Sequence, residues 1–315
     1  MKSRSLQSKL FFAYISLACL ILFSFAVFFY AFVSRQLKQS QISAMNTLNS
    51  RFQTQVDSAI RNLDAVSVNI NYSNQSKTIL DNSFNLNISS NMLSAMSDLF
   101  ISLSGTELKA DQVNLYDFSG YVLEAGISTI VKKTDGSKDE WIEVARELEG
   151  KKVLTPPYCT REYTKTATYD QWFISLYRSF NNQYKRGVGV IETAKQCKSV
   201  FKSIITYKKK NHEDAASIYV FDSNGDLIYP YDISQEYKAA LQPYYELTKG
   251  DDSALTFISP LTGKTEYAAE AVSSYTGYTY LTIQPESVVL APVYNLLRIL
   301  AAIVAETGAM QFRAK

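Results

Sequence analysis

The 315-residue sequence has a single histidine, His212, and only three cysteines. Its cysteines and histidine do not show the spacing of a zinc site. His212 lies in the charged run KKKNHED, the setting of an exposed loop. The GxxxxGK[ST] loop of nucleotide-binding proteins and the GxSxG turn of hydrolases are both missing. We therefore expect a protein that is not an enzyme and that binds no metal or other cofactor.

The fraction of charged residues is also low, at 20%. The chain has 32 basic and 30 acidic residues, a net charge of +2. A nucleic-acid-binding surface needs a basic face, so we expect no nucleic-acid partner. Basic residues instead gather near the two ends, which suits a chain whose ends both lie on the cytoplasmic side of a membrane. They are Lys2, Arg4, Lys9, Arg298, Arg313 and Lys315.

The cysteine pattern leaves two alternatives open. Cys19 lies in the apolar N-terminal stretch, whereas Cys159 and Cys197 lie in the middle of the chain. If the middle of the chain is outside the cell, Cys159 and Cys197 can form one disulfide. The alternative is two separate, partly buried thiols.

One long run of residues without charge stands near the N-terminus. Residues 10–33 read LFFAYISLACLILFSFAVFFYAFV. About 20 apolar residues span a bilayer as a helix, whereas the apolar core of a signal peptide has only about 7–15. A signal peptide ends at a cleavage site with small residues, which Phe32 and Val33 do not match. We therefore expect a transmembrane helix that is retained. More basic residues precede this helix than directly follow it. This predicts a protein of the cell membrane whose N-terminus is cytoplasmic and whose main domain is extracytoplasmic.

Residues 34–75 are expected to continue as a stalk helix. Proline and glycine are absent from this segment, and apolar residues recur from Leu37 to Ile70 at steps that are mostly three or four. Such a stripe is typical of one face of a helix. It either packs on its own domain or on a partner subunit, and we expect a homodimer through this helix.

An internal repeat marks the middle of the chain. VNLYDFSGYVL at 113–123 and IYVFDSNGDLI at 218–228 share an Asp, at 117 and 222, and a Gly three residues later. Asp accepts turn hydrogen bonds and Gly supplies a positive φ, so each copy predicts a β-hairpin.

Similar elements follow each hairpin, which indicates an α+β fold with antiparallel sheets in two tandem lobes. We expect an exposed connection at 208–214. The predicted helices cover 138–148, 194–205 and 235–248. The predicted strands cover 169–180, 187–192, 254–258, 265–272 and 278–283.

This organisation resembles the double Cache region, the PAS-like extracytoplasmic input of bacterial sensors. The runs SLQSKLFFAYISLACLILFSF, WFISLYRSFNN and GYTYLTIQPESVVLAPVYNLLRIL look most like those of Gram-positive sensor histidine kinases. The resemblance implies a small-molecule-sensing input region of a two-component sensor histidine kinase, truncated here before its HAMP segment and kinase. The alternatives are the Cache input of a chemoreceptor or other transmembrane regulator, and a surface-anchored binding or adhesion protein without signalling output.

The resemblance also divides the chain into six segments. They are a cytoplasmic N-terminus (1–9), a transmembrane helix (10–33), a stalk helix (34–75), a membrane-distal lobe that holds the ligand (76–205), a membrane-proximal lobe (206–287) and an exit helix or truncated second membrane segment (288–315).

The amino-acid-binding members of this family carry a motif that the chain matches in part. Trp141, Ala145 and Tyr158 match it, and Glu192 stands where the family has Asp. Asp139 stands where the family has the Arg that grips a ligand carboxylate. An α-amino acid bound in the usual way is therefore not expected, and an amine, a sugar or a peptide remains open.

The residues themselves also favour a pocket in this region. Aromatic faces and a few charges are what ligand pockets combine. Alternation along 169–180 puts residues 170, 172, 174, 176 and 178 on one face. The alternative is that Trp141 and Trp172 are buried in the hydrophobic core and bind no ligand. The candidate ligand-binding residues are Trp141, Tyr158, Arg161, Trp172, Glu192 and Asp139, with Tyr163 and Asp170 as further contributors.

Overall fold

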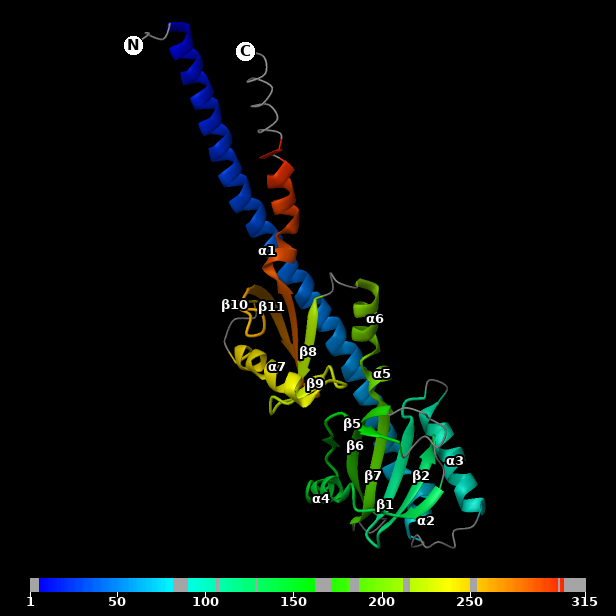
Figure 1. Cartoon of the computed structure of the whole chain (residues 1–315). Coiled ribbons are helices and arrows are strands. Elements are labelled where there is room, and N and C mark those ends of the chain that lie inside the picture. Colours follow the sequence, from blue (N-terminus) through cyan, green and yellow to red (C-terminus); the bar gives the residue numbers. More distant parts are fainter. Residues whose placement is uncertain are drawn as a thin grey trace. The chain divides into compact units, whose positions relative to one another are not determined.

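A computed structural model shows how these elements fold (Figure 1). The chain forms two compact units. One comprises residues 1–48, 252–269 and 282–315, and the other comprises residues 49–251 and 270–281. The structure describes residues 6–81, 90–105, 108–127, 130–161, 171–181, 187–211, 216–249, 254–299 and 301–302.

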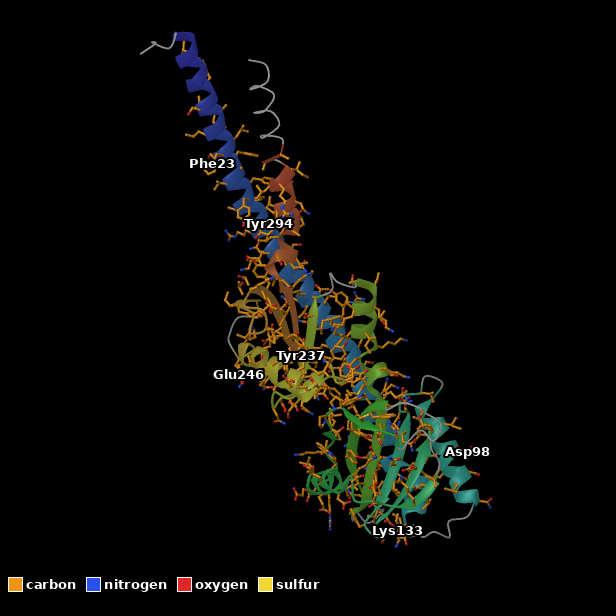
Figure 2. All side chains as sticks on the ribbon, in the orientation of Figure 1. Phe23, Asp98, Lys133, Tyr237, Glu246 and Tyr294 are labelled. Atoms are coloured by element: carbon orange, nitrogen blue, oxygen red, sulfur yellow. The ribbon has the colours of Figure 1, made fainter. Side chains whose placement is uncertain are left out.

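The apolar N-terminal run belongs to one helix, α1 (Leu6–Tyr72). Among the described residues, α1 is the helix that is long and apolar enough to cross a membrane, and its apolar window has a mean hydropathy of 2.4. None of that window is buried within the protein. Figure 2 shows Phe23 projecting away from the helix, and its side chain is 72% exposed. A side chain of this kind needs an apolar surrounding, which a bilayer supplies.

The later part of α1 buries a stripe of apolar residues within its own chain. Phe52, Val56, Ile60 and Leu63 are all at most 4% exposed. Their spacing of three or four residues puts them on one helix face. Of the two alternatives for the stripe, packing on the chain's own domain is therefore confirmed.

The first sheet has seven strands in the order β3-β2-β1-β7-β6-β4, with β5 also pairing with β6. The pairs β1–β2, β1–β7 and β6–β7 are antiparallel. The strands are β1 (Gln112–Asp117), β2 (Tyr121–Gly126), β3 (Ile130–Lys133), β4 (Val153–Leu154), β5 (Tyr158–Thr160), β6 (Gln171–Asn181) and β7 (Gly187–Gln196). The helices in this stretch are α2 (Asn74–Asp81), α3 (Ser90–Ser104) and α4 (Asp139–Glu147).

The second sheet has five strands in the order β10-β11-β12-β8-β9. Residues 291–299 are helical. The strands are β8 (Ser217–Phe221), β9 (Leu227–Tyr229), β10 (Ala254–Ile258), β11 (Thr265–Val272) and β12 (Thr279–Pro285). The remaining helices are α5 (Cys197–Val200), α6 (Lys202–Asn211), α7 (Gln235–Leu247) and α8 (Glu286–Val289). The long apolar helix and the two antiparallel sheets confirm the predicted α+β fold class.

Both hairpins form as their sequences predict. Asp117 Oδ1 accepts hydrogen bonds from the backbone N–H groups of Ser119 and Tyr121 at 3.0 and 2.8 Å. Asp222 Oδ1 does the same for Asn224 and Asp226 at 2.9 and 2.8 Å. The two glycines that follow have φ of +87° and +90°, the left-handed region that favours glycine.

Two predicted elements differ from the structure. Residues 194–196 extend β7 rather than starting a helix, because they pair with β6. The helix that follows is broken into α5 and α6. Residues 208–211, expected in an exposed connection, form the last turn of α6, where the positive charge of Lys208, Lys209 and Lys210 complements the helix dipole. The rest of that run, His212 included, lies outside the described residues.

The two cysteines of the middle region are not joined by a disulfide. Cys159 is exposed on β5, whereas Cys197 is buried at the start of α5. The alternative of two separate thiols therefore holds.

Candidate functional site

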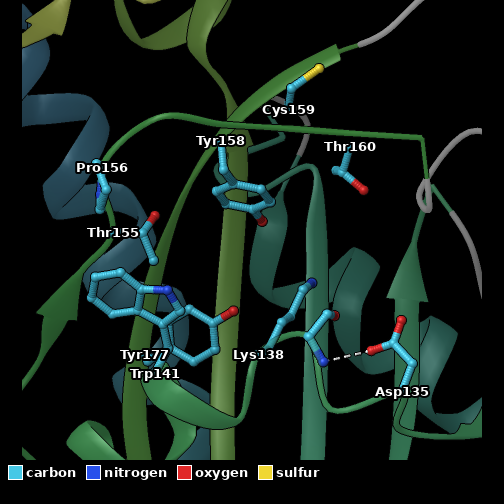
Figure 3. Close-up of a pocket in the computed structure, with 10 residues that line it drawn as sticks. Asp135, Lys138, Trp141, Thr155, Pro156, Tyr158, Cys159, Thr160 and Tyr177 are labelled. Atoms are coloured by element: carbon cyan, nitrogen blue, oxygen red, sulfur yellow. Dashed lines mark hydrogen bonds between the residues drawn. The ribbon is translucent and has the colours of Figure 1, made fainter. Parts of the chain in front are cut away.

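A cavity of about 400 Å³ opens on one face of the first sheet, where α4 and the β4–β5 connection pass over it. Its volume falls in the range of small-molecule pockets. Figure 3 shows the side chains that surround it. The lining residues are Asp135, Ser137, Lys138, Trp141, Thr155, Pro156, Tyr158, Cys159, Thr160 and Tyr177.

The position of α4 follows from its buried face. Ile142 and Ala145 are three residues apart and pack with Tyr116 and Tyr177 of the sheet in one apolar cluster. Asp139 and Glu140 occupy the first turn, where the helix dipole favours negative charge. This packing puts Trp141, which contacts the same cluster, at the cavity wall.

Beneath the cavity lies the carboxylate of Glu192, which is fully buried. On β7 it sits opposite Asn114 of β1 and opposite Tyr177 of β6. Side chains directly opposite on neighbouring strands lie on the same face of a sheet. The registers therefore gather polar groups from three strands around one carboxylate.

Both carboxylate oxygens of Glu192 accept short hydrogen bonds. Asn114 Nδ2 and the Tyr116 hydroxyl donate to Oε2 at 2.7 and 2.6 Å. Ser175 Oγ donates to Oε1 at 2.6 Å. The Tyr158 hydroxyl lies 3.1 Å from Oε1 and 2.7 Å from Ser175 Oγ. Neutral donors therefore satisfy most of the capacity of this buried carboxylate.

The charge of Glu192 is stabilised despite its burial. Burial alone raises the pKa of the carboxyl group, but the nearby Lys138 ammonium and the hydrogen bonds from Ser175, Tyr116 and Asn114 outweigh it and lower the pKa to about 2. Conversely, burial and the charge of Glu192 raise the pKa of Tyr116 well above its ordinary value. Glu192 is thus an anion, and Tyr116 a neutral donor, at every physiological pH.

Lys138 is the cation at this site. Its Nζ lies 3.3 Å from Glu192 Oε2 and 3.5 Å from Oε1, longer than the contacts of the neutral donors. The same ammonium lies 5.8 Å from the centre of the Tyr158 ring. The Lys138 side chain is 15% exposed whereas that of Glu192 is 0% exposed, so Lys138 stands between the carboxylate and the open cavity.

Aromatic rings form the apolar part of the wall. The rings of Trp141 and Tyr177 stack with centroids 6.5 Å apart and an interplanar angle of 21°. Tyr158 lies across the cavity from this pair, and its hydroxyl, the Tyr177 hydroxyl and Lys138 point into the same space (Figure 3). Rings of this kind offer flat apolar surface with a polar edge.

The opposite face of the sheet packs on α1. Thr193 Oγ1 donates to the Leu63 carbonyl at 3.2 Å. Arg178 donates to Ser67 Oγ at 3.0 Å and forms an ion pair with Asp64. Tyr275 also donates to Asp64, at 2.6 Å. This network fixes α1 beneath the sheet.

The predicted ligand-binding residues are distributed over several places. Trp141 and Tyr158 line the cavity, and Glu192 lies beneath it. Asp139 lines a neighbouring cavity of only about 20 Å³. Arg161 is exposed and is not among the residues that line the main cavity. The sixth residue is Trp172.

Trp172 lies on the other face of β6. Alternation along the strand is as predicted, but the odd-numbered residues lie on the cavity side: Tyr177 lines the cavity, and Ser175 bonds to Glu192 beneath it. The ring of Trp172 instead contacts Tyr231, with centroids 5.8 Å apart. Tyr163 and Asp170 lie outside the described residues.

With this geometry established, comparison with known proteins identifies the fold. The sequence matches no protein-family model and no curated protein. Solved structures of sensory domains do match it. The periplasmic sensory domain of the Campylobacter jejuni chemoreceptor Tlp1 is 14% identical with a TM-score of 0.57, over 81% of this chain and 99% of that one. The fold is Cache-like.

Two further Cache-like structures were solved with ligands. The sensory domain of the Campylobacter jejuni chemoreceptor Tlp3, with isoleucine bound, is 14% identical with a TM-score of 0.55, over 82% of this chain and 98% of that one. The ligand-binding domain of the Pseudomonas aeruginosa amino acid chemoreceptor PctC, in complex with GABA, is 9% identical with a TM-score of 0.53, over 77% and 98%.

Several residues of this site were not predicted from the sequence. Lys138 directly precedes α4, and from the sequence alone it looks like an exposed surface lysine. Asn114, Tyr116 and Ser175 lie within strands, where polar residues in apolar runs are easily overlooked. One signal was present, because Glu192 in the apolar run GVGVIET requires buried donors and a cation nearby.

Proposed function

We propose that the chain is the extracytoplasmic small-molecule-sensing input region of a membrane-bound signal-transduction protein. The observation that carries the proposal is the cavity of about 400 Å³ that the Cache-like first sheet forms above a buried, charged Glu192. The chemoreceptor domains of the same fold, solved with isoleucine and GABA, support it. The site acts by binding, and we assign no reaction to it.

The proposed topology places residues 10–33 in the membrane and the two sheets outside the cell. The exposed apolar window of α1 and the excess of basic residues before it support this orientation. Assembly as a homodimer through α1 is part of the proposal. A sensor histidine kinase and a chemoreceptor fit equally well as the parent protein.

Binding would act on signalling through a shift between conformations. A ligand that binds one arrangement of the lobe better than another shifts the equilibrium toward it. The Arg178–Asp64 pair joins β6, which carries cavity residues, to α1. A change in β6 would therefore reach the helix that leads to the membrane.

The two tryptophans of the chain provide the test. Trp141 lines the cavity and Trp172 lies on the other face of the sheet. Trp172→Phe leaves Trp141 as the single tryptophan, and Trp141→Phe leaves Trp172 as the matched control. The full chain in lipid nanodiscs is titrated with amino acids, amines, sugars and organic acids while tryptophan fluorescence is recorded.

We expect a saturable change of Trp141 emission with at least one compound class, and a much smaller change in the Trp172-only control. The same compound should raise the melting temperature, because a ligand that binds only the folded state stabilises it. If no compound changes the emission of a cooperatively folded chain, the sensing role is refuted.

A further inference from the structure

Two charged side chains line this cavity: Lys138, which contacts the buried Glu192, and Asp135, which is exposed at the edge. Lys138 lines the cavity, whereas the Glu192 side chain is 0% exposed and lies behind it. A positively charged ligand that passes this edge and approaches Glu192 would meet the Lys138 ammonium, and like charges in a partly enclosed site repel.

Glu192 is also poorly placed to bind a ligand ammonium. It accepts hydrogen bonds at 2.6–2.7 Å from Asn114, Tyr116 and Ser175, and the Tyr158 hydroxyl lies at 3.1 Å. An ammonium could reach it only by displacing donors of the protein, which would leave buried groups unsatisfied. Lys138, by contrast, makes the longest contacts to the carboxylate, at 3.3 and 3.5 Å.

We infer that the ligand is a small monocarboxylate with an apolar body, bound through Lys138, and that its recognition needs no ammonium group. The inference rests on the sensing function proposed above and names the ligand class. Glu192 acts as a positioning residue, since it holds the Lys138 side chain at the cavity wall.

The remaining walls set the other features of this ligand. The stacked rings of Trp141 and Tyr177, together with Tyr158 and Pro156, offer apolar surface for its body. Asp135 is exposed at the edge of the cavity, and hydrogen bonds from Ser137 lower its pKa, so it is ionised there. A negative charge at this edge disfavours ligands with a second carboxylate.

The test uses sets of compounds with the same apolar body and different charge. The first set is isovalerate, isoamylamine and isoamyl alcohol with leucine as the zwitterion, and the second is phenylacetate, phenethylamine and phenethyl alcohol with phenylalanine. Each is titrated into the full chain in nanodiscs, with Trp172→Phe as background, and empty nanodiscs correct for partitioning. We expect isovalerate or phenylacetate to change Trp141 emission and the matching amine and alcohol not to.

Three variants in the same background examine the role of Lys138. We expect Lys138→Met to weaken carboxylate binding about tenfold or more, since it removes a charge-assisted hydrogen bond. Lys138→Arg retains the charge and should retain binding, and it covers the case in which Lys138→Met fails to fold. Lys133→Met, which removes an exposed lysine of β3 outside the cavity, is the control and should bind normally.

Other outcomes separate the inference from the proposed function. Binding of the amine, of the alcohol or of the zwitterion alone overturns the inference but leaves the sensing function in place. Carboxylate binding that survives Lys138→Met also overturns it. If no compound in either set binds but the broader screen finds a ligand, the inference fails, and if neither finds one, both fail.

Discussion

The buried carboxylate of Glu192 makes the stability of the first sheet depend on pH in a predictable way. Its pKa falls from an ordinary 4.5 to about 2 in the folded chain. A carboxyl group with a lowered pKa stabilises the fold fully above its unfolded value, and the stabilisation is lost as the pH falls through its folded value. The relevant window is therefore from about pH 5 down to pH 2.

The magnitude follows from the same two values. One pKa unit corresponds to ~1.4 kcal/mol, so the lowering of this pKa contributes about 3 kcal/mol at neutral pH. At pH 3 about 1 kcal/mol of that contribution remains. Glu192→Gln keeps the shape of the side chain and removes the titration. The difference in unfolding free energy between wild type and Glu192→Gln should accordingly shrink by about 2 kcal/mol between pH 6.5 and pH 3.

Urea unfolding of the full chain in nanodiscs, followed by tryptophan fluorescence, measures this difference. Both tryptophans report on the first sheet, since Trp141 lies on α4, which packs on it, and Trp172 lies on β6. Asp139→Asn, which removes an exposed carboxylate of the same region, is the matched substitution measured alongside. A wild-type to Glu192→Gln difference that is the same at both pH values would refute the reasoning.

Three further changes should destabilise the chain for separate reasons. Asp64→Asn weakens the ion pair with Arg178 and should cost about 2 kcal/mol, measured as a lower urea midpoint; no change would mean that this pair is not a stabilising contact. Gly189→Ala would put a Cβ 2.2 Å from the Tyr116 carbonyl oxygen, so a cost of about 2 kcal/mol or poor folding is expected, and a neutral effect would contradict the β1–β7 register. Ser234→Ala removes the side-chain cap of α7 and should cost about 1 kcal/mol by thermal unfolding, whereas Ser234→Asp should retain the cap.

The features that depend on local chemistry could be predicted from the sequence. The hairpin turns at Asp117 and Asp222 form because one side chain binds the N–H groups of its own turn, and a glycine follows in the required conformation. The long apolar run of α1 follows from its composition, and the buried stripe that comes after it follows from spacing along one helix. None of these features requires knowledge of distant residues.

The candidate site could be predicted only in part, because its geometry depends on which face of the sheet is covered by α1. Residues of β6 are buried on both faces, so their polarity did not show that Ser175 faces the cavity and Trp172 does not. The role of Lys138 depends on Glu192, which is 54 residues away in the sequence and meets it only through the packing of α4 on the sheet. Such pairings are a property of the tertiary structure.

The position of Cys159 offers a chemical label beside the cavity. Its thiol is exposed and points away from the lining rings (Figure 3), whereas Cys197 is buried and burial raises the pKa of that thiol. Since the thiolate is the reactive form, a charged maleimide should alkylate Cys159 much faster than Cys197 in a Cys19→Ser chain. The attached group would lie on the side of β5 opposite the cavity, next to Trp172, so a ligand that changes Trp141 emission should still bind the alkylated chain. Loss of that binding after alkylation, which mass spectrometry would verify, would instead place the thiol in the cavity.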